Sequence, residues 1–160
     1  MMRWDVVSRL LRNPTIGAEL GAHGGRFTER LLAAHKHLVM VAIDTWTPRP
    51  GYDLYDFPTI EADFRQRMGK FGKRVRPLRM ETVAAAREFP DAHFDFVFID
   101  ADHSYEAVTA DIDAWRPKLK AGGLLCGHDY GHPRFPGVKR AVDEQFIPST
   151  GDDCVWWVRC

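Results

Sequence analysis

Two short segments carry most of the side chains that could do chemistry. Residues 98–106 read Phe-Ile-Asp-Ala-Asp-His-Ser-Tyr-Glu, and residues 125–130 read Leu-Cys-Gly-His-Asp-Tyr. Each segment begins in an apolar run that is typical of a buried strand. Neighbouring parallel strands would bring Asp100 close to His128 and Asp129, because the carboxyl ends of such strands meet at one edge of a sheet.

These oxygen and nitrogen atoms suit a divalent cation such as Mg²⁺ or Mn²⁺. We therefore predict a metal site of Asp100, His128 and Asp129, where the ion would lower the pKa of a bound substrate hydroxyl. Histidine titrates near neutral pH, so His103 or His128 could instead act as a general base. The structural alternative is that Asp102 or Ser104 caps the following helix while His128 and Asp129 hydrogen-bond only to loop backbone.

A glycine-rich turn follows the first apolar run of the chain. Residues 18–27 read Ala-Glu-Leu-Gly-Ala-His-Gly-Gly-Arg-Phe. Glycine lets the chain turn sharply and lets a ligand approach the backbone, and the N-terminus of the next helix attracts anionic groups. Asp44 ends the next apolar run about 20 residues later, the distance expected of an acid that accepts hydrogen bonds from ribose hydroxyls. Alternatively, the turn only permits tight packing and Asp44 caps a turn.

Short apolar runs alternate with segments of helical periodicity along the chain. This alternation predicts βαβ units and an α/β fold, with a doubly wound, mostly parallel sheet and helices on both of its faces. Pro77 places the third strand at a sheet edge. Strands are expected at residues 15–21, 37–44, 74–81, 94–100, 122–129 and 154–160. Helices are expected at residues 2–11, from about 26, and at 60–71, 83–89, 104–119 and 138–146.

Length and charge narrow the remaining possibilities. The chain of 160 residues argues for one domain, residues 1–160. Its 22 basic and 22 acidic residues balance, so the composition gives no sign of a nucleic-acid partner. No run is long or apolar enough to span a bilayer, and residues 1–13 lack the apolar core of a signal peptide. We therefore expect a cytoplasmic protein that does not contact membranes.

The segment Phe94–Glu106 closely resembles the fourth motif of class I S-adenosylmethionine-dependent methyltransferases, in the FIDGDHSYE version found in a group of small-molecule O-methyltransferases. The similarity continues into Lys120–Gly123, which resembles the family's L-x-P-G-G turn, and into His128–Tyr130. Glu19–Gly21 resembles the first motif, and Asp44 resembles the acid of the second. The resemblance predicts a methyltransferase with S-adenosylmethionine as its cofactor.

The resemblance also implies a role for individual residues. The fold would be Rossmann-like and would end in an antiparallel strand, for which residues 154–160 are the candidate. Asp44 would accept the ribose hydroxyls, and Asp100 would stand beside the transferred methyl. In metal-dependent relatives the ion is held by oxygen ligands, one of which His128 would replace. The residues implied to bind the donor are Glu19, Gly21, Gly25, Asp44, Thr45, Trp46, Met80, Glu81, Thr82 and Asp100.

The predicted reaction is methyl transfer from S-adenosylmethionine to a small-molecule acceptor, at a hydroxyl oxygen. Its catalytic candidates are Asp100, His103 and His128. Residues 45–58 and 130–136 form the expected acceptor walls. Their side chains could grip the acceptor or could simply pack the loops onto the sheet; they are Trp46, Tyr52, Tyr55, Tyr130, His132, Arg134 and Phe135.

Two other functions are compatible with the same fold. A nucleotide- or NAD-binding protein would use the same acid after the second strand, but its G-x-G-x-x-G turn does not fit Gly21, Gly24 and Gly25. A non-catalytic S-adenosylmethionine binder would keep the cleft without turnover, since fold alone does not decide activity. Residues 155–158 either form an edge strand that pairs in a homodimer or are buried against the last helix.

Overall fold

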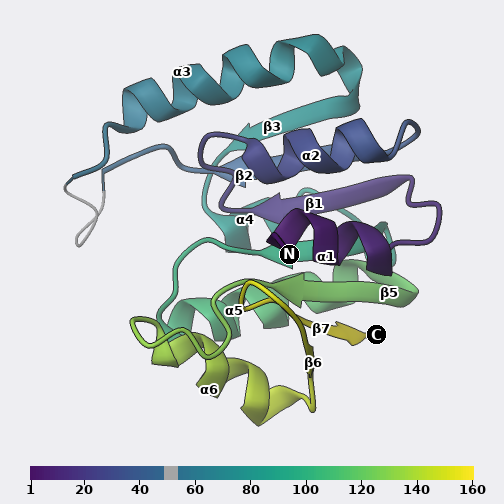
Figure 1. Ribbon diagram of the computed structural model, residues 1–160, viewed down its shortest axis with the longest axis vertical. Helices are drawn as coiled ribbons and strands as arrows, with labels where there is room; N and C mark the ends of the chain where they lie inside the picture. The colour runs from purple at the N-terminus through teal and green to yellow at the C-terminus, as the bar shows by residue number, and fades with distance from the viewer. Residues whose placement is uncertain (49–53) are drawn as a thin grey trace.

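The computed structural model describes residues 1–48 and 54–160, which form a sheet of seven strands in the order β3-β2-β1-β4-β5-β7-β6 (Figure 1). β1 to β5 run parallel to one another, whereas β7 lies antiparallel between β5 and β6. The strand order reverses between β1 and β4, which is where open α/β sheets bind ligands. The strands are β1 (Ile16–Leu20), β2 (Val39–Asp44), β3 (Val75–Arg79), β4 (Phe94–Ile99), β5 (Leu119–Gly127), β6 (Ser149–Thr150) and β7 (Trp156–Arg159).

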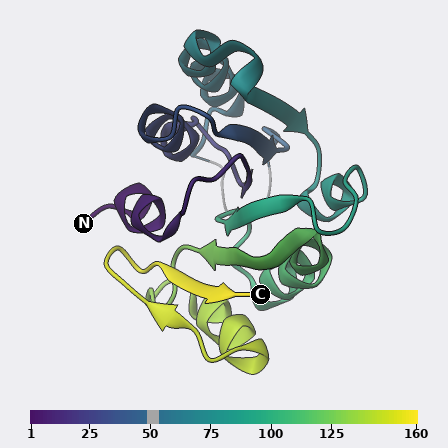
Figure 2. The same ribbon diagram turned by 90° about the vertical axis from the view of Figure 1, so that its right-hand side faces the viewer.

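Helices cover both faces of this sheet (Figure 2). On one face are α1 (Arg3–Leu10), α2 (Arg26–Ala34) and α3 (Phe57–Met68). On the other are α4 (Thr82–Ala86), α5 (Tyr105–Trp115) and α6 (Pro136–Gln145). Short 3₁₀ helices at Gly69–Arg74 and Arg116–Lys118 lead into β3 and β5. The predicted Rossmann-like architecture with a C-terminal antiparallel strand is therefore confirmed.

The central strands are buried because their apolar side chains point alternately to the two helical layers. In β4, Phe96 and Phe98 pack with α1 and α2, while Val97 and Ile99 pack with α4, α5 and α6. None of these four side chains is more than 4% exposed. The apolar run of β4 does not alternate with polar residues, because the strand is covered by helices on both faces of the sheet.

Several elements differ from their expected bounds, and the place of the last strand remained open in the sequence. α4 ends at Ala86 rather than at Phe89, although Phe89 is still buried. β5 begins at Leu119, and its register against β4 shifts near its start, so it is longer than expected. β7 lies inside the sheet and its Trp156 is fully buried in the core that includes α6, so residues 155–158 are not an edge strand. β3 lies at the sheet edge, as Pro77 predicted.

Across the residues that the structure describes, no helix combines the length and the apolar character needed to cross a membrane.

Candidate functional site

The carboxyl ends of β1, β2 and β4 are joined by backbone hydrogen bonds that extend the strand ladders. The Gly21 N–H donates to the Ile43 carbonyl at 2.8 Å, and the Asp100 N–H donates to the Leu20 carbonyl at 2.8 Å. Gly21 has a φ of +89°, and a Cβ built on it would lie 2.1 Å from the Asp100 carbonyl oxygen. Only glycine accommodates both that dihedral angle and that approach, so Gly21 allows direct contact between the β1 and β4 ends.

Asp44 ends β2 and already uses its carboxylate within the fold. Its Oδ2 accepts a hydrogen bond from the His23 N–H at 2.8 Å, and its Oδ1 accepts one from the Trp46 N–H at 2.9 Å. A carboxylate has about four lone-pair sites, so both oxygens keep further acceptor capacity. One side chain can therefore cap the turn and also accept hydrogen bonds from a ligand.

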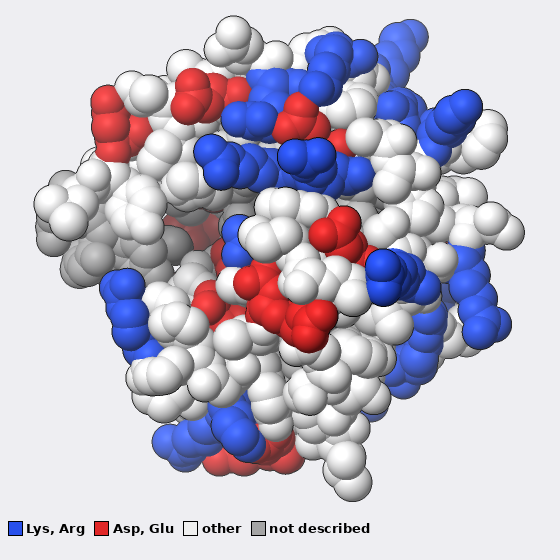
Figure 3. All heavy atoms as spheres, in the orientation of Figure 1, with Lys and Arg blue, Asp and Glu red and all other residues white. Residues whose placement is uncertain are grey.

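A cleft of about 460 Å³ opens at this edge, between the ends of β1 to β4 and helix α5. Cavities of this size hold small-molecule ligands. None of the described residues that line the cleft is basic, and five are acidic: Asp44, Glu81, Asp102, Glu106 and Asp111. The cleft therefore favours a positively charged ligand over an anionic one. Acidic side chains also gather near the middle of the face seen in Figure 1, where α1 begins (Figure 3).

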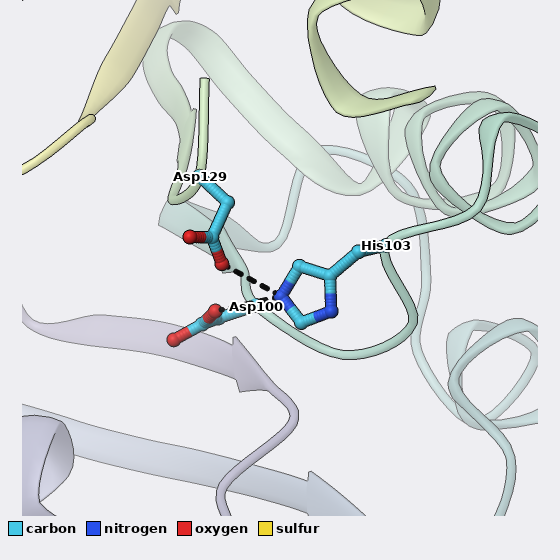
Figure 4. A group of neighbouring side chains, drawn as sticks. All are labelled: Asp100, His103 and Asp129. Carbon is cyan, nitrogen blue, oxygen red and sulfur yellow. Dashed lines mark ion pairs between the residues drawn. The ribbon is translucent and has the colours of Figure 1, made fainter. Parts of the chain in front are cut away.

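Beside the cleft lies a group of charged side chains, the Asp100 cluster, which consists of Asp100, His103, His128, Asp129 and Arg3. His103 Nε2 lies 2.8 Å from Asp129 Oδ2 and 3.5 Å from Asp100 Oδ1 (Figure 4). His128 Nδ1 lies 3.1 Å from Asp129 Oδ2 and 3.7 Å from Asp100 Oδ1. Arg3 Nη1 lies 3.6 Å from Asp100 Oδ2 and 3.2 Å from His128 Nδ1. The structure thus brings Asp100, His128 and Asp129 together, and adds His103 and Arg3.

Local structure fixes the members of this cluster. The His128 N–H donates to the Ile99 carbonyl at 3.1 Å and so continues the β4–β5 ladder past its last residue pair. Asp129 then takes a φ of +60°, a left-handed conformation that Asp tolerates better than most residues. The His103 ring stacks on Phe135, with ring centroids 4.2 Å apart. Each ring and carboxylate is therefore held before any ligand binds.

The carboxylates and imidazoles of the cluster shift the pKa values of one another toward their charged forms. Burial lowers the pKa of His103, but hydrogen bonds and attraction from Asp100 and Asp129 outweigh that effect and raise the pKa to about 10. Burial also lowers the pKa of His128, but a hydrogen bond with Asp129 and attraction from Asp100 and Asp129 outweigh that effect and raise the pKa above its ordinary value. Burial raises the pKa of Asp129, but the two histidines pull it well below its ordinary value. Because a protonated imidazole cannot accept a proton, this arrangement disfavours His103 as a general base.

The same side chains fit a divalent cation by their chemistry. Asp100, His103 and Asp129 each offer one ligand atom, and these atoms lie within 4.8 Å of one another. The predicted ligand His128 adjoins both carboxylates. Carboxylate oxygens alone would suit Mg²⁺, whereas added imidazole nitrogens favour Mn²⁺. The structure therefore places His103 among the side chains that could ligate a cation, beside the predicted set.

Glu19 lies beneath this edge of the sheet, on β1, and is only 2% exposed. Thr28 on α2 donates its hydroxyl to Glu19 Oε2 at 2.5 Å. Burial raises the pKa of Glu19 to about 8, against the lowering effect of that hydrogen bond, and the nearby Asp100 raises it further. At neutral pH Glu19 is therefore mostly an uncharged carboxylic acid.

The other residues predicted to bind a donor divide into two groups. Thr45, Met80, Glu81 and Thr82 line the cleft. Thr82 also donates its hydroxyl to Asp111 Oδ1 at 2.5 Å, and burial raises the pKa of Asp111 to about 6.

Trp46 and Gly25 do not line the cleft. Trp46 has a φ of +46°, which turns its side chain into the core, where it is 3% exposed and packs against Phe64. Gly25 precedes α2 with a φ of +78°, and a Cβ built on it would lie 2.9 Å from the Phe64 ring. These two residues shape the turn from within and are not placed to contact a ligand in the cleft.

The residues expected in the acceptor walls also lie in different surroundings. Phe135 reaches the Asp100 cluster through its stacking on His103, and the Arg134 guanidinium lies over the Phe135 ring. The Tyr130 hydroxyl instead donates to Asp143 on α6 at 2.6 Å. Tyr55 is exposed, with its ring edge-on to His23. His132 accepts a hydrogen bond from the Arg134 N–H, and Tyr52 lies outside the described residues.

Two contributions were missed by reasoning from the sequence. Arg3 enters the Asp100 cluster from α1, and the sequence of an amphipathic helix does not indicate that its first residue reaches a distant strand end. Glu106 and Asp111 line the cleft because α5 begins there. Ser104 caps α5 as predicted by accepting the Ala107 N–H, and the spacing of four residues from Ala107 to Asp111 could have placed Asp111 on the face of the helix that lines the cleft.

Comparison with solved structures identifies the fold. The chain is similar to CalS11, a TDP-rhamnose 3′-O-methyltransferase of calicheamicin biosynthesis, with 22% identity, a TM-score of 0.68, and coverage of 98% of this chain and 76% of that one. It is also similar to the O-methyltransferase NovP, with 21% identity, a TM-score of 0.68, and coverage of 97% and 74%. For the 1,6-didemethyltoxoflavin-N1-methyltransferase of Burkholderia thailandensis, solved with S-adenosylhomocysteine, the identity is 16%, the TM-score 0.61, and the coverage 98% and 74%.

Those identities establish a shared fold only, and no curated protein matches the sequence. The sequence itself matches a family described as "Methyltransferase domain" over residues 18–130, from β1 to the end of the Asp100 cluster. Because that match extends over more than half of the chain, the protein belongs to the methyltransferase domain family, whose chemistry implies S-adenosylmethionine as the methyl donor.

Proposed function

We propose that this protein transfers a methyl group from S-adenosylmethionine to a hydroxyl oxygen of a small-molecule acceptor. The observation that carries the proposal is the acidic cleft at the carboxyl ends of the strands, which adjoins a preorganised group of carboxylates and imidazoles. The donor is a sulfonium cation with an adenosine portion, and the cleft offers carboxylates to both. A nicotinamide dinucleotide carries an anionic pyrophosphate, which five acidic side chains would repel.

The residues of the cleft have distinct parts in donor binding. Asp44 accepts hydrogen bonds from the ribose hydroxyls, since its carboxylate keeps free lone pairs after capping the turn. Met80, Glu81 and Thr82 frame the adenine. Gly21 allows the donor to approach the backbone, where a side chain would already collide with Asp100.

The Asp100 cluster would receive the acceptor. When bound, the donor supplies a methyl group that the acceptor oxygen takes by in-line displacement, which leaves a neutral thioether. The hydroxyl proton passes to the Asp100 carboxylate, because His103 is already protonated. The cationic His103 ring lies within 4 Å of both carboxylates and stabilises negative charge as it develops on the oxygen.

The proposal includes a divalent cation that would be held by Asp100, His128 and Asp129, with His103 as a further ligand once its imidazole has lost its proton. Such an ion, when bound, lowers the pKa of a coordinated hydroxyl. The support is the donor set itself, whose atoms converge within 4.8 Å for Asp100, His103 and Asp129. Turnover should rise with added Mn²⁺ and fall with EDTA if the ion takes part, and indifference to both would exclude it.

Calorimetric titration with S-adenosylhomocysteine tests the donor site. Asp44→Asn keeps one carbonyl oxygen but loses the charge, and should weaken binding by about 1–3 kcal/mol, or about 5- to 150-fold. Asp63→Asn changes an exposed carboxyl on α3 and serves as the matched control, with unchanged affinity expected. Equal affinity for the wild type and Asp44→Asn would remove Asp44 from the ribose-binding role, and absence of binding to the wild type would refute the proposed function.

A further inference from the structure

Helix α1 delivers a cationic side chain to the acceptor end of the site. Arg3 is the first residue of α1, and its backbone N–H donates to Asp153 Oδ2 at 2.7 Å. One turn further on, Val6 and Val7 are buried in the core beside α2. The helix is thus anchored by its apolar face and tied at its N-terminus to the turn before β7, which directs the Arg3 side chain toward Asp100.

The Arg3 guanidinium sits among the atoms that would ligate a metal ion. Its Nη1 lies 3.6 Å from Asp100 Oδ2 and 3.2 Å from His128 Nδ1, two atoms of the proposed ligand set. Arg3 Nε is buried and has no hydrogen-bond partner among the residues that the structure describes. The side chain is therefore held by attraction to the Asp100 carboxylate and by the contacts of Nη1 with the His128 ring, while Nε stays unsatisfied, which makes it displaceable.

The charge of the cluster disfavours binding of a divalent cation while Arg3 stays in place. Two carboxylates, Asp100 and Asp129, supply the negative charge, and Arg3 and the protonated His103 already compensate part of it. A divalent cation bound to Asp100 and His128 would lie next to the guanidinium at a separation where like charges repel strongly. The Arg3 guanidinium and the ion therefore compete for Asp100 and His128, and the presence of one weakens binding of the other.

We propose that Arg3 is a built-in cation that competes with a divalent metal ion for Asp100 and His128, so that the N-terminal turn of α1 must move away before the ion binds. This inference rests on the cation site of the proposed function. It assigns α1 a part in metal occupancy, beyond its packing against the sheet. The class of ligand is a divalent cation that accepts mixed oxygen and imidazole ligands, and Mn²⁺ is the probe.

The test measures binding of Mn²⁺ alone, by the electron paramagnetic resonance signal of the free ion, without donor or acceptor. Arg3→Met removes the charge and should bind Mn²⁺ at least about tenfold more tightly than the wild type. Arg3→Lys keeps the charge and should bind as weakly as the wild type. Arg9→Met removes an exposed charge from the other end of the same helix, and should also leave the affinity unchanged.

A second measurement uses the wild type only, so it does not depend on the folding of a variant. Saturating Mn²⁺ should speed hydrogen exchange of the first amides of α1, because the ion displaces Arg3 and loosens the contact between its N–H and Asp153. Equal Mn²⁺ affinity of the wild type and Arg3→Met, absence of Mn²⁺ binding to both, or unchanged exchange in α1 would each overturn the inference. Binding of S-adenosylhomocysteine by calorimetry tests the proposed function separately, so the two failures are distinguishable.

Discussion

Replacing Glu19 by Gln should reduce the number of protons that the protein releases when the donor binds. Glu19 is buried beneath the cleft, its pKa is raised to about 8, chiefly by burial, and Asp100 and Asp44 raise it further. At pH 7 such a group is about 90% protonated. A sulfonium donor brings positive charge toward it and should favour the ionised form, so binding should release close to one proton.

The same pKa sets the effect of the substitution on stability. Above pH 4.5 the unfolded chain ionises Glu19, whereas the folded protein keeps it protonated until about pH 8. The stability of the wild type therefore falls as the pH rises through this window, by about 3 kcal/mol between pH 4.5 and pH 7. Gln cannot ionise in either state, so the stability of Glu19→Gln relative to the wild type should increase with pH across the same window.

Two assays separate these effects. Calorimetric titrations of S-adenosylmethionine, at one pH in two buffers of different ionisation enthalpy, count the protons released. Urea unfolding between pH 5 and pH 8 follows the stability difference. Glu88→Gln, which changes an exposed carboxyl after α4, is the matched control for both assays.

The result that refutes this reasoning is specific. If the enthalpy of donor binding to the wild type does not depend on the buffer, Glu19 does not ionise on binding. If Glu19→Gln releases as many protons as the wild type, another group is responsible. A stability difference that stays constant from pH 5 to pH 8 would show that Glu19 is ionised in the free protein.

Three further predictions concern the frame of the site. Gly21→Ala should destabilise the protein by more than about 2 kcal/mol and abolish donor binding, because the added Cβ would collide with the Asp100 carbonyl at a residue with a positive φ. The Cβ of the control Gly24→Ala would meet no atom within 4 Å, so that substitution should have little effect. Urea unfolding and calorimetry compare the two variants. Trp115→Ala should cost about 3–5 kcal/mol in urea unfolding, since the ring is fully buried, and a loss below about 1 kcal/mol would contradict its place in the core. Burial raises the pKa of Asp95, but hydrogen bonds from a lysine and from backbone N–H groups outweigh that effect and lower the pKa to about 2. Asp95→Asn should therefore destabilise the protein by about 1 kcal/mol at pH 7. Thermal unfolding scans should show this difference vanish as the pH falls from 4 to 2.

The fold was predictable because its buried strands and its helices have different patterns of apolar residues in the sequence. The run from Val39 to Asp44 and the run from Phe94 to Ile99 are too short for helices and too apolar for edge strands, which leaves a parallel sheet covered on both faces. Once the strands are parallel, the approach of Asp100 to Asp129 follows from the fold alone, because β4 and β5 are neighbours.

The remainder of the site depends on torsion angles and long-range packing that no local pattern encodes. Trp46 was expected beside a ligand because it follows Asp44, but one positive φ turns it into the core. Arg3 reaches the site only because α1 packs beside α2. His103 was predicted as a base, yet two carboxylates that meet it in space raise its pKa and keep it protonated.

The most direct test of the central claim is a crystal structure of the protein with S-adenosylhomocysteine. We predict the adenosine in the cleft, with its ribose hydroxyls within hydrogen-bonding distance of Asp44, its adenine beside Thr82, and its sulfur directed toward Asp100. A complex in which the ligand occupies another surface, or in which Asp44 and Asp100 contact different molecules, would contradict the account.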